Sequence, residues 1–316
     1  MIGRGSRVVV AVLAIAALVL PWLPFVYPVF AIDLICFALF AVSLDLLFGF
    51  VGLLSFGQAL FWGGGGYLAA ITIARGHVDA SIAIAAGMAY AVVTAALVGA
   101  IAVRRAGIFF AMITLGVAQI QYFTAVQLID YTGGDNGLNF GNRGTLFGVA
   151  IENDHVFYYF ALALIALGVW FSVRLVRSPF GGVLRAMREN EPRTIALGYR
   201  VNRYKLVVFT IAGGLAGLAG ALYAIGNHLA GLEMVDWHTS GSVVMMTVLG
   251  GIGTIFGPII GAALFESLDY FVSKSPLIGQ ETNMVMGLVF AVCVLLFRRG
   301  IVGELLARLA KRPGSG

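Results

Sequence analysis

Long apolar runs follow one another along almost the whole chain, and the polar segments between them are short. An apolar run of about 20 residues is long enough for a helix to cross the hydrocarbon core of a bilayer. Such a helix satisfies its own backbone hydrogen bonds, which lipid cannot do for it. Charged residues make up 11% of the chain, less than half of the share of about 25% in soluble domains. We therefore expect an all-α integral membrane protein.

The runs predict a polytopic helical bundle of about eight transmembrane spans, in one domain that covers residues 1–316. The expected spans are 8–20, 29–48, 52–75, 81–103, 107–129, 155–176, 205–226 and 283–299. The first run resembles a secretory signal sequence, but no small-residue cleavage site follows it, so we interpret it as a span. Residues 241–272 are interrupted by glycines and a proline, and they predict a re-entrant or short-helix hairpin.

Lys and Arg are distributed unevenly between alternate loops. With the N-terminus in the cytoplasm, the inner segments hold all 20 of these residues except Arg75, Arg143 and Lys274. This asymmetry follows the positive-inside rule, so both termini are expected in the cytoplasm. The net charge of +5 is explained by this orientation, and we expect lipid but no nucleic acid as a partner.

Two segments on the opposite side are rich in turn-forming residues. The extracytoplasmic loop 130–154 holds many Gly, Asn and Asp residues, and 227–240 forms a second loop. Such loops are surfaces for a partner or a polar solute, or plain solvated loops. The histidines and acids of 227–240 do not have the spacing of a closed metal site, so no metal ligand is predicted.

The sequence contains no phosphate-binding loop of the Walker type. That loop requires a lysine directly after a glycine, whereas Lys205, Lys274 and Lys311 are the only lysines and none follows a glycine. No triad of serine, histidine and acid is suggested either. We therefore expect a non-catalytic chain with no cofactor of its own.

Polar residues inside the expected spans are costly in lipid unless they face protein or water. They are Asp33, Asp45, Gln58, Thr114, Gln119, Gln121, Glu266 and Asp269. The amides and the hydroxyl suggest the lining of a polar passage, with hydrogen bonds between helices as an equal alternative for each. An ion-coupled carrier would use the acids, ideally with a basic residue at mid-depth, which these spans lack. Glycine-interrupted segments at 55–70 and 248–264 suggest two repeats with a path between them.

The longest charged segment is GGVLRAMRENEPRTIALGYRVNRYK at 181–205. Its sequence predicts two short helices, because Pro192 suits a first helical position and Gly198 suits a stop. Isolated helices of this length are marginal in water, so they must dock on their own bundle, on anionic headgroups or on another protein. The apolar residues available for docking are Leu184, Met187, Ile195 and Leu197.

Several motifs, taken in order, resemble the branched-chain amino-acid permease family, the LivM-type subunits of ABC importers. They are GLLSFGQALFWGGGGYLAA at 52–70, ITLGVAQI at 113–120, TGGDNGL at 132–138, the charged segment, YKLVVFTIAGGLAGLAGALYA at 204–224 and VLGGIGTIFGPIIGA at 248–262. The resemblance covers residues 30–300. Two positions differ from the family's patterns: a fourth glycine precedes Tyr67 where alanine is usual, and Gln119 stands where glutamate is usual.

The resemblance implies a permease subunit of an ATP-driven importer in a bacterial cytoplasmic (inner) membrane, carrying branched-chain or related amino acids. It implies a second homologous permease, two cytoplasmic ABC ATPase subunits that bind ATP and Mg²⁺, and an extracytoplasmic solute-binding protein. Together with the polar residues in the spans, it predicts a path lined by Gln58, Gly65, Tyr67, Thr114 and Gln119. In the cytoplasmic coupling loop 177–204, the expected ATPase-coupling residues are Arg185, Arg188, Glu189, Asn190, Pro192, Ala196 and Gly198. The alternatives are a permease for urea or short amides, an ion-coupled secondary carrier, and a scaffold without transport.

Overall fold

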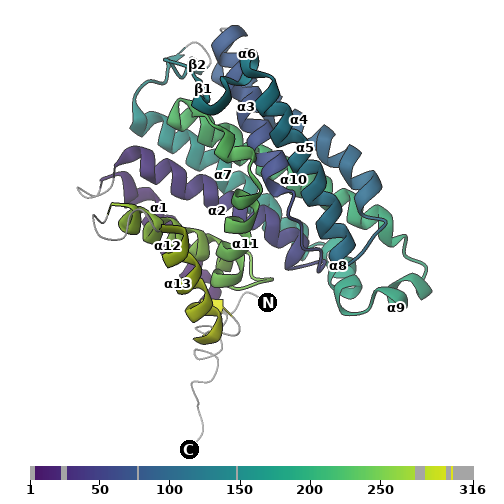
Figure 1. Ribbon diagram of the computed structural model, residues 1–316. Helices are drawn as coiled ribbons and strands as arrows, with labels where there is room; N and C mark the ends of the chain where they lie inside the picture. Colours follow the sequence, from purple (N-terminus) through teal and green to yellow (C-terminus); the bar gives the residue numbers. More distant parts are fainter. Residues whose placement is uncertain are drawn as a thin grey trace, which may run out of the picture.

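The computed structural model describes residues 4–22, 27–76, 78–146, 149–274, 282–296 and 300–301. Over these residues the chain forms a bundle of helices with short strands at one end (Figure 1). The helices are α1 (Arg4–Val19), α2 (Pro28–Phe48), α3 (Gln58–Gly76), α4 (Ala80–Ala102), α5 (Ile108–Gln127), α6 (Ile129–Thr132), α7 (Asp154–Arg177), α8 (Pro179–Glu189), α9 (Glu191–Ala196), α10 (Val201–Asn227), α11 (Trp237–Gly250), α12 (Phe256–Ser273) and α13 (Thr282–Leu296). The 3-10 turns are η1 (Leu20–Trp22), η2 (Gly134–Asn136) and η3 (Leu232–Val235), and the strands are β1 (Leu138–Asn139), β2 (Thr145–Leu146), β3 (Val149–Ala150) and β4 (Leu229–Ala230).

Five helices of the described chain are long and apolar enough to cross a membrane, namely α2, α4, α5, α7 and α10. The polytopic all-α architecture is therefore confirmed. These five helices are fewer than the eight spans expected from the sequence. The expected spans at 8–20 and 283–299 coincide with α1 and α13, whose described lengths are 16 and 15 residues. The two-repeat organisation stays a prediction.

Glycines allow α3, α4 and α10 to pack backbone against backbone. A Cβ atom added to Gly65 would lie 2.6 Å from the carbonyl oxygen of Gly217, and one added to Gly87 would lie 2.4 Å from that of Gly65. A Cβ atom added to Gly220 would lie 1.9 Å from the carbonyl oxygen of Trp62. Small residues permit this close approach of helices in membranes, so these glycines hold the centre of the bundle together.

The interruption predicted within 55–70 is not found at its glycine run, residues 63–66. The α3 helix runs without interruption from Gln58 to Gly76, because neighbouring helices fill the space that side chains would occupy. The expected start of this span at residue 52 is also wrong, since residues 49–57 contain no helix. Gly52 has a φ of +82°, a conformation that does not continue a helix.

The interruption predicted within 241–272 is present, as a turn at 251–255 between α11 and α12. Gly251 and Gly253 have φ angles of +122° and +78°, which reverse the chain there. Pro258 lies in the first turn of α12, where a missing N–H is tolerated. The second helix has 18 residues, so the hairpin is asymmetric rather than a pair of short helices.

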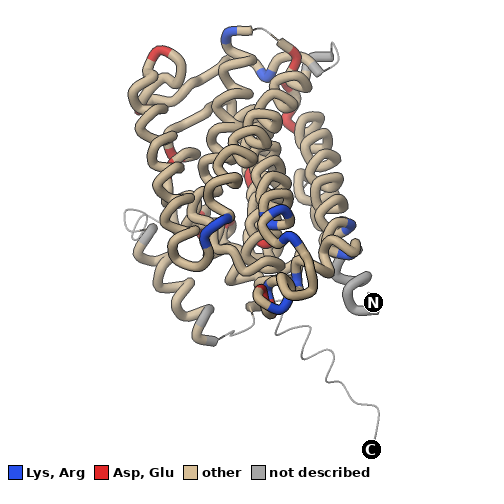
Figure 2. Tube along the Cα trace, turned by 90° about the vertical axis from the view of Figure 1, so that its right-hand side faces the viewer, with Lys and Arg blue, Asp and Glu red and all other residues tan. Residues whose placement is uncertain are grey.

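Two ends of the bundle differ in structure and in charge. At one end, strand β1 pairs with β4 in antiparallel register and joins loop 130–154 to the segment after α10. At the other end lie α8 and α9 (Figure 1), the two helices predicted within the charged segment. Lys and Arg lie mostly in the lower half of Figure 2, which is the α8–α9 end of Figure 1.

Candidate functional site

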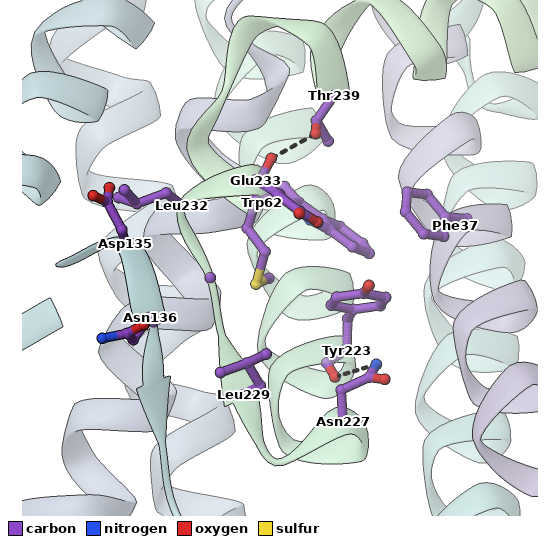
Figure 3. Close-up of a pocket in the computed structure, with 13 residues that line it drawn as sticks. Phe37, Trp62, Asp135, Asn136, Tyr223, Asn227, Leu229, Leu232, Glu233 and Thr239 are labelled. Carbon is purple, nitrogen blue, oxygen red and sulfur yellow. Dashed lines mark hydrogen bonds between the residues drawn. The ribbon is translucent and has the colours of Figure 1, made fainter. Parts of the chain in front are cut away.

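A cavity of about 320 Å³ lies near the β1–β4 end of the bundle, between α2, α3, α10 and the segment that follows α10 (Figure 3). Its lining combines aromatic rings, carboxyl and carboxamide groups, and aliphatic side chains. The lining residues are Phe37, Trp62, Asp135, Asn136, Gly137, Tyr223, Asn227, Leu229, Gly231, Leu232, Glu233, Met234 and Thr239. The cavity therefore offers both polar and apolar surface to a small solute.

Aromatic rings in contact with one another form one wall of this cavity, to which Phe37, Trp62 and Tyr223 contribute. The ring of Trp62 lies 5.0 Å from that of Phe37, 4.5 Å from that of Phe40 and 5.1 Å from that of Tyr223, measured between centroids. Trp62 is almost fully buried, so its neighbours hold it in place. Aromatic groups fixed in this way present a rigid apolar surface.

The polar part of the lining carries negative charge. Asp135 comes from η2 and Glu233 from η3, and both side chains are exposed. Asn227 is held at the end of α10, because its Nδ2 donates to Oδ1 of Asp33 at 2.6 Å and to the carbonyl of Tyr223 at 3.1 Å. The described lining includes no Lys or Arg. A positively charged group is therefore favoured beside these carboxylates.

Another part of the lining is made by the chain as it runs along α3 after β4. A Cβ atom on Gly63 would lie 2.4 Å from Cγ1 of Val235, and one on Gly66 would lie 2.5 Å from Cε of Met234. Glycine at these two positions thus admits the η3 segment. These two glycines of the run thereby leave room for the η3 part of the cavity wall.

A buried arginine joins loop 130–154 to the end of α10, next to the cavity residue Asn227. Arg143 is fully buried, and its Nη1 pairs with Oδ1 of Asp154 at 2.6 Å. Its Nη2 donates to the carbonyl of Gly226 at 2.8 Å, and its Nε donates to that of Ile225 at 3.3 Å. The positive charge thereby caps the C-terminal end of α10, where the helix dipole favours a cation.

The next residue after α10, His228, has an unusual environment. Its φ of +56° is left-handed, and its Nδ1 has no hydrogen-bond partner among the described residues. Burial lowers the pKa of His228 from its ordinary value of 6.5, and the nearby charge of Arg143 lowers it further. The neutral imidazole is therefore the favoured form.

None of the five predicted path residues is in the lining of this cavity. Gly65 packs against α10, and Thr114 makes structural hydrogen bonds, accepting from the Phe56 N–H and donating to the Ala111 carbonyl. Gln119 on α5 is half-buried. The role of these residues in a path stays a prediction.

Gln58 and Tyr67 have a property that fits a polar passage. Gln58 is fully buried, and neither its Oε1 nor its Nε2 has a hydrogen-bond partner in the described structure. The same holds for the hydroxyl of Tyr67 and for Oε1 of Gln121. Gln58 lies one helical turn from Trp62 on the same face of α3. Unpartnered buried groups are costly, so this is where water or a solute would be stabilised.

The predicted apolar docking face of the charged segment is half correct. Leu184 and Met187 of α8 are buried against the bundle. Ile195 and Leu197, in contrast, are 55% and 69% exposed. The α8 helix therefore docks on its own chain, whereas α9 leaves apolar surface uncovered.

The α9 helix is nonetheless firmly placed. Oδ1 of Asn190 accepts from the Arg193 N–H at 3.0 Å and caps the helix. Nζ of Lys205, which is buried, lies 2.6 Å from Oε1 of Glu191. Gly198 ends this segment with a φ of +89°, in agreement with the stop predicted there.

The remaining predicted coupling residues point in different directions. Arg185, Glu189, Pro192 and Ala196 are exposed. Arg188 is exposed as well, but its Nη1 donates to the carbonyl of Gly49, at the end of α2. Its charge is thus directed to the bundle, which the sequence did not indicate.

The residues that line the cavity were not predicted as site residues from the sequence. Trp62 and Tyr223 stand within apolar runs and are indistinguishable there from packing residues. Asp135 and Glu233 lie in the two loops interpreted as surfaces for a solute or partner. Their acidic character was the available signal, and the pairing of β1 with β4 explains how the two loops come together.

Comparison with known proteins decides the family. Residues 28–297 match the family described as branched-chain amino acid transport system / permease component. The chain belongs to this family. It is 28% identical to the high-affinity branched-chain amino acid transport system permease protein LivM of Escherichia coli (strain K12) over 289 residues, 82% of this chain and 68% of that protein.

Other members are similar over shorter stretches. LivM of Salmonella typhimurium is 31% identical over 53% of this chain and 45% of its own length. The ribose import permease protein RbsC of Bacillus subtilis is 27% identical over 58% of each chain. No solved structure matches the chain. The resemblance seen in the sequence is confirmed, and the family includes permeases whose names specify different solutes.

Proposed function

We propose that this chain is the membrane-embedded permease subunit of an ATP-driven importer for branched-chain or related amino acids. The observation that supports it most is the cavity, in which the aromatic wall of Trp62, Phe37 and Tyr223 faces a rim that carries Asp135 and Glu233. The ammonium group and the apolar side chain of such an amino acid match these two parts of the lining. Its ammonium group would be attracted by the carboxylates and the ring faces, and its side chain would lie on the rings.

The energy for transport would come from partner subunits. The chain lacks a phosphate-binding loop, so ATP and Mg²⁺ would be bound by two cytoplasmic ATPases. The exposed apolar residues Ile195 and Leu197 flank Ala196 on α9 and offer a contact surface for such a subunit. A second homologous permease would complete the bundle, and a solute-binding protein would deliver the solute to the β1–β4 end.

In this arrangement the α8–α9 end lies in the cytoplasm and the β1–β4 end outside, in the bacterial inner membrane. The concentration of Lys and Arg at the α8–α9 end (Figure 2) supports this orientation. Both termini would then be cytoplasmic.

A substitution on α9 tests the ATPase contact. Ala196→Trp keeps every charge but adds bulk to an exposed position beside Ile195. We expect it to detach the ATPase or to uncouple ATP hydrolysis from uptake, whereas Arg200→Gln, at the far end of the loop, should have a milder effect. Co-purification of the ATPase and ATP-dependent uptake in proteoliposomes are the measurements. If α9 instead binds anionic lipid, Ala196→Trp will be harmless and each lost arginine will weaken function by about 1 kcal/mol.

Sugar import is a second candidate, because the ribose permease is a relative and sugar rings also stack on aromatic side chains. Uptake of labelled leucine, with unlabelled leucine or ribose as competitor, separates the two. We expect competition by leucine and none by ribose. Uptake that follows an ion gradient and needs no ATP would instead identify an ion-coupled carrier.

A further inference from the structure

Arg188 reaches a point where three segments of the bundle meet. From α8, its Nη1 donates to the carbonyl of Gly49, directly after α2. A Cβ atom on Gly253, in the turn between α11 and α12, would lie 3.1 Å from the same Nη1 and 3.2 Å from the Gly49 oxygen. The guanidinium group is therefore in contact with the end of α2 and with this turn.

A buried carboxyl group lies at the same junction. Asp45 is fully buried, and its Oδ1 accepts a hydrogen bond from the Gly253 N–H at 2.7 Å. Its Oδ2 has no partner in the described part of the chain. Asp45 thus holds the α11–α12 turn on α2 with one oxygen and leaves the other unpartnered.

Arg188 and Asp45 are not paired with each other in the described structure, although both contact Gly49 and Gly253. A guanidinium group binds a carboxylate more strongly than a neutral carbonyl, because the bond is charge-assisted and can be bidentate. An unpartnered oxygen on a buried carboxylate is also costly. The junction therefore has two available arrangements, one with Arg188 on the Gly49 carbonyl and one with Arg188 on Asp45.

We propose that Arg188 is a positioning residue for transport, which moves between the Gly49 carbonyl and the Asp45 carboxylate when α8 is displaced. In the second arrangement, the guanidinium binds both oxygens of Asp45 as a bidentate pair, displaces the Gly253 N–H from Oδ1 and frees the α11–α12 turn from α2. The proposal rests on the proposed function, since the displacement of α8 comes from the ATPase. It assigns to Arg188 an action inside the permease, distinct from contact with the partner.

The turn is connected to the cavity by one helix. The α11 helix has 14 residues, a length of about 21 Å at 1.5 Å per residue. It begins at Trp237, between the cavity residues Glu233 and Thr239, and ends at the turn. A shift of the turn is therefore transmitted along α11 to the wall of the cavity.

The test uses the complete complex of permeases, ATPases and binding protein in proteoliposomes. Arg188→Gln, Arg188→Lys, Asp45→Asn and the Arg188→Gln/Asp45→Asn double variant are compared, with Arg200→Gln as a control for loss of positive charge. Three quantities are measured: the ATPase that co-purifies, the rate of ATP hydrolysis and the uptake of labelled leucine. The wild-type complex must show ATP-dependent uptake, and a failure of that step counts against the proposed function alone.

We expect Arg188→Gln to retain the ATPase and its hydrolysis while uptake falls about tenfold, the size of a typical coupling between sites. The double variant should lose no more than Arg188→Gln, because the two residues act as one unit. Arg188→Lys should recover part of the uptake. This comparison of Arg188→Lys with Arg188→Gln remains informative if Asp45→Asn does not fold. Loss of the ATPase from Arg188→Gln, unchanged uptake, additive losses, or equal defects in the Lys and Gln variants would each overturn the proposal.

Discussion

Arg143 and Asp154 form an ion pair in which the arginine side chain is 1% exposed and the aspartate is 40% exposed. Arg143→Met removes this pair and the hydrogen bonds to the last carbonyls of α10. Because hydrogen bonds from a charged group are worth more than neutral ones, we expect a loss of stability of about 2–3 kcal/mol. Thermal unfolding of the detergent-purified protein measures it. Arg75→Met, an exposed change at the same end, should lose less than about 1 kcal/mol, and equal losses would contradict the anchoring role of Arg143.

The lowered pKa of His228 predicts a dependence of stability on pH. Below its ordinary pKa of 6.5, the unfolded chain binds a proton at this residue more readily than the folded chain does. Stability should therefore fall as the pH decreases from about 7.5 to 5.5. Asn tolerates a positive φ and does not titrate in this range. His228→Asn should therefore reduce the slope of the unfolding temperature against pH. An unchanged slope would show that other groups cause the dependence.

Gly65 and Gly116 provide a matched pair for testing helix packing. A Cβ atom at Gly65 meets the backbone of Gly217, whereas nothing lies within 4 Å of one at Gly116. We expect Gly65→Ala to lower stability by about 1–3 kcal/mol through overpacking, and Gly65→Leu to prevent assembly. Gly116→Ala should be neutral or stabilising. Normal assembly of Gly65→Leu with loss of uptake would instead support the predicted position of Gly65 in the solute path.

Substitution of Gln58 distinguishes a role in the solute path from a role in helix packing. Replacing a buried, unpartnered amide by a leucine of similar volume removes a desolvation penalty. Gln58→Leu should therefore keep or raise the unfolding temperature while uptake of leucine falls. A stable variant with normal uptake would place the path elsewhere.

The orientation in the membrane can be measured at two exposed residues of opposite ends, Asn139 on β1 and Glu189 on α8. Each is replaced by cysteine after removal of Cys36 and Cys293. We expect a membrane-impermeant thiol reagent to label position 139 in intact cells and position 189 only in inverted vesicles. The reverse pattern would overturn the orientation and with it the proposed ATPase contact.

The main elements of the fold could be predicted from sequence because lipid requires each span to close its own backbone hydrogen bonds. Pro192 and Gly198 likewise marked the limits of α9, since each has a restricted or unusual backbone preference. The glycine run at 63–66 could not be interpreted in this way. Glycine disfavours an isolated helix, but here η3, α4 and α10 pack against the exposed backbone and keep α3 intact.

The cavity required information that the sequence does not contain. Trp62 becomes a wall residue because the chain returns along α3 after β4, and this return depends on contacts between distant segments. Arg188 and Arg185 show the same difficulty on a smaller scale. They are exposed arginines on one short helix, yet Arg188 donates to the Gly49 carbonyl and no such bond to the bundle is found for Arg185 among the described residues. The direction of a side chain follows from docking, which the pattern alone cannot show.

The α10 helix has 27 residues, about 40 Å at 1.5 Å per residue, and it joins the two ends of the molecule without a break. Tyr223 and Asn227 near one end line the cavity, and Val201 at the other follows the charged segment directly. Its glycines bring the backbones of α3 and α4 against it, so rotation of α10 about its own axis would press side chains into those backbones. A displacement at Val201 would therefore reach Tyr223 as a shift of the whole helix, so that the two ends of the molecule move together.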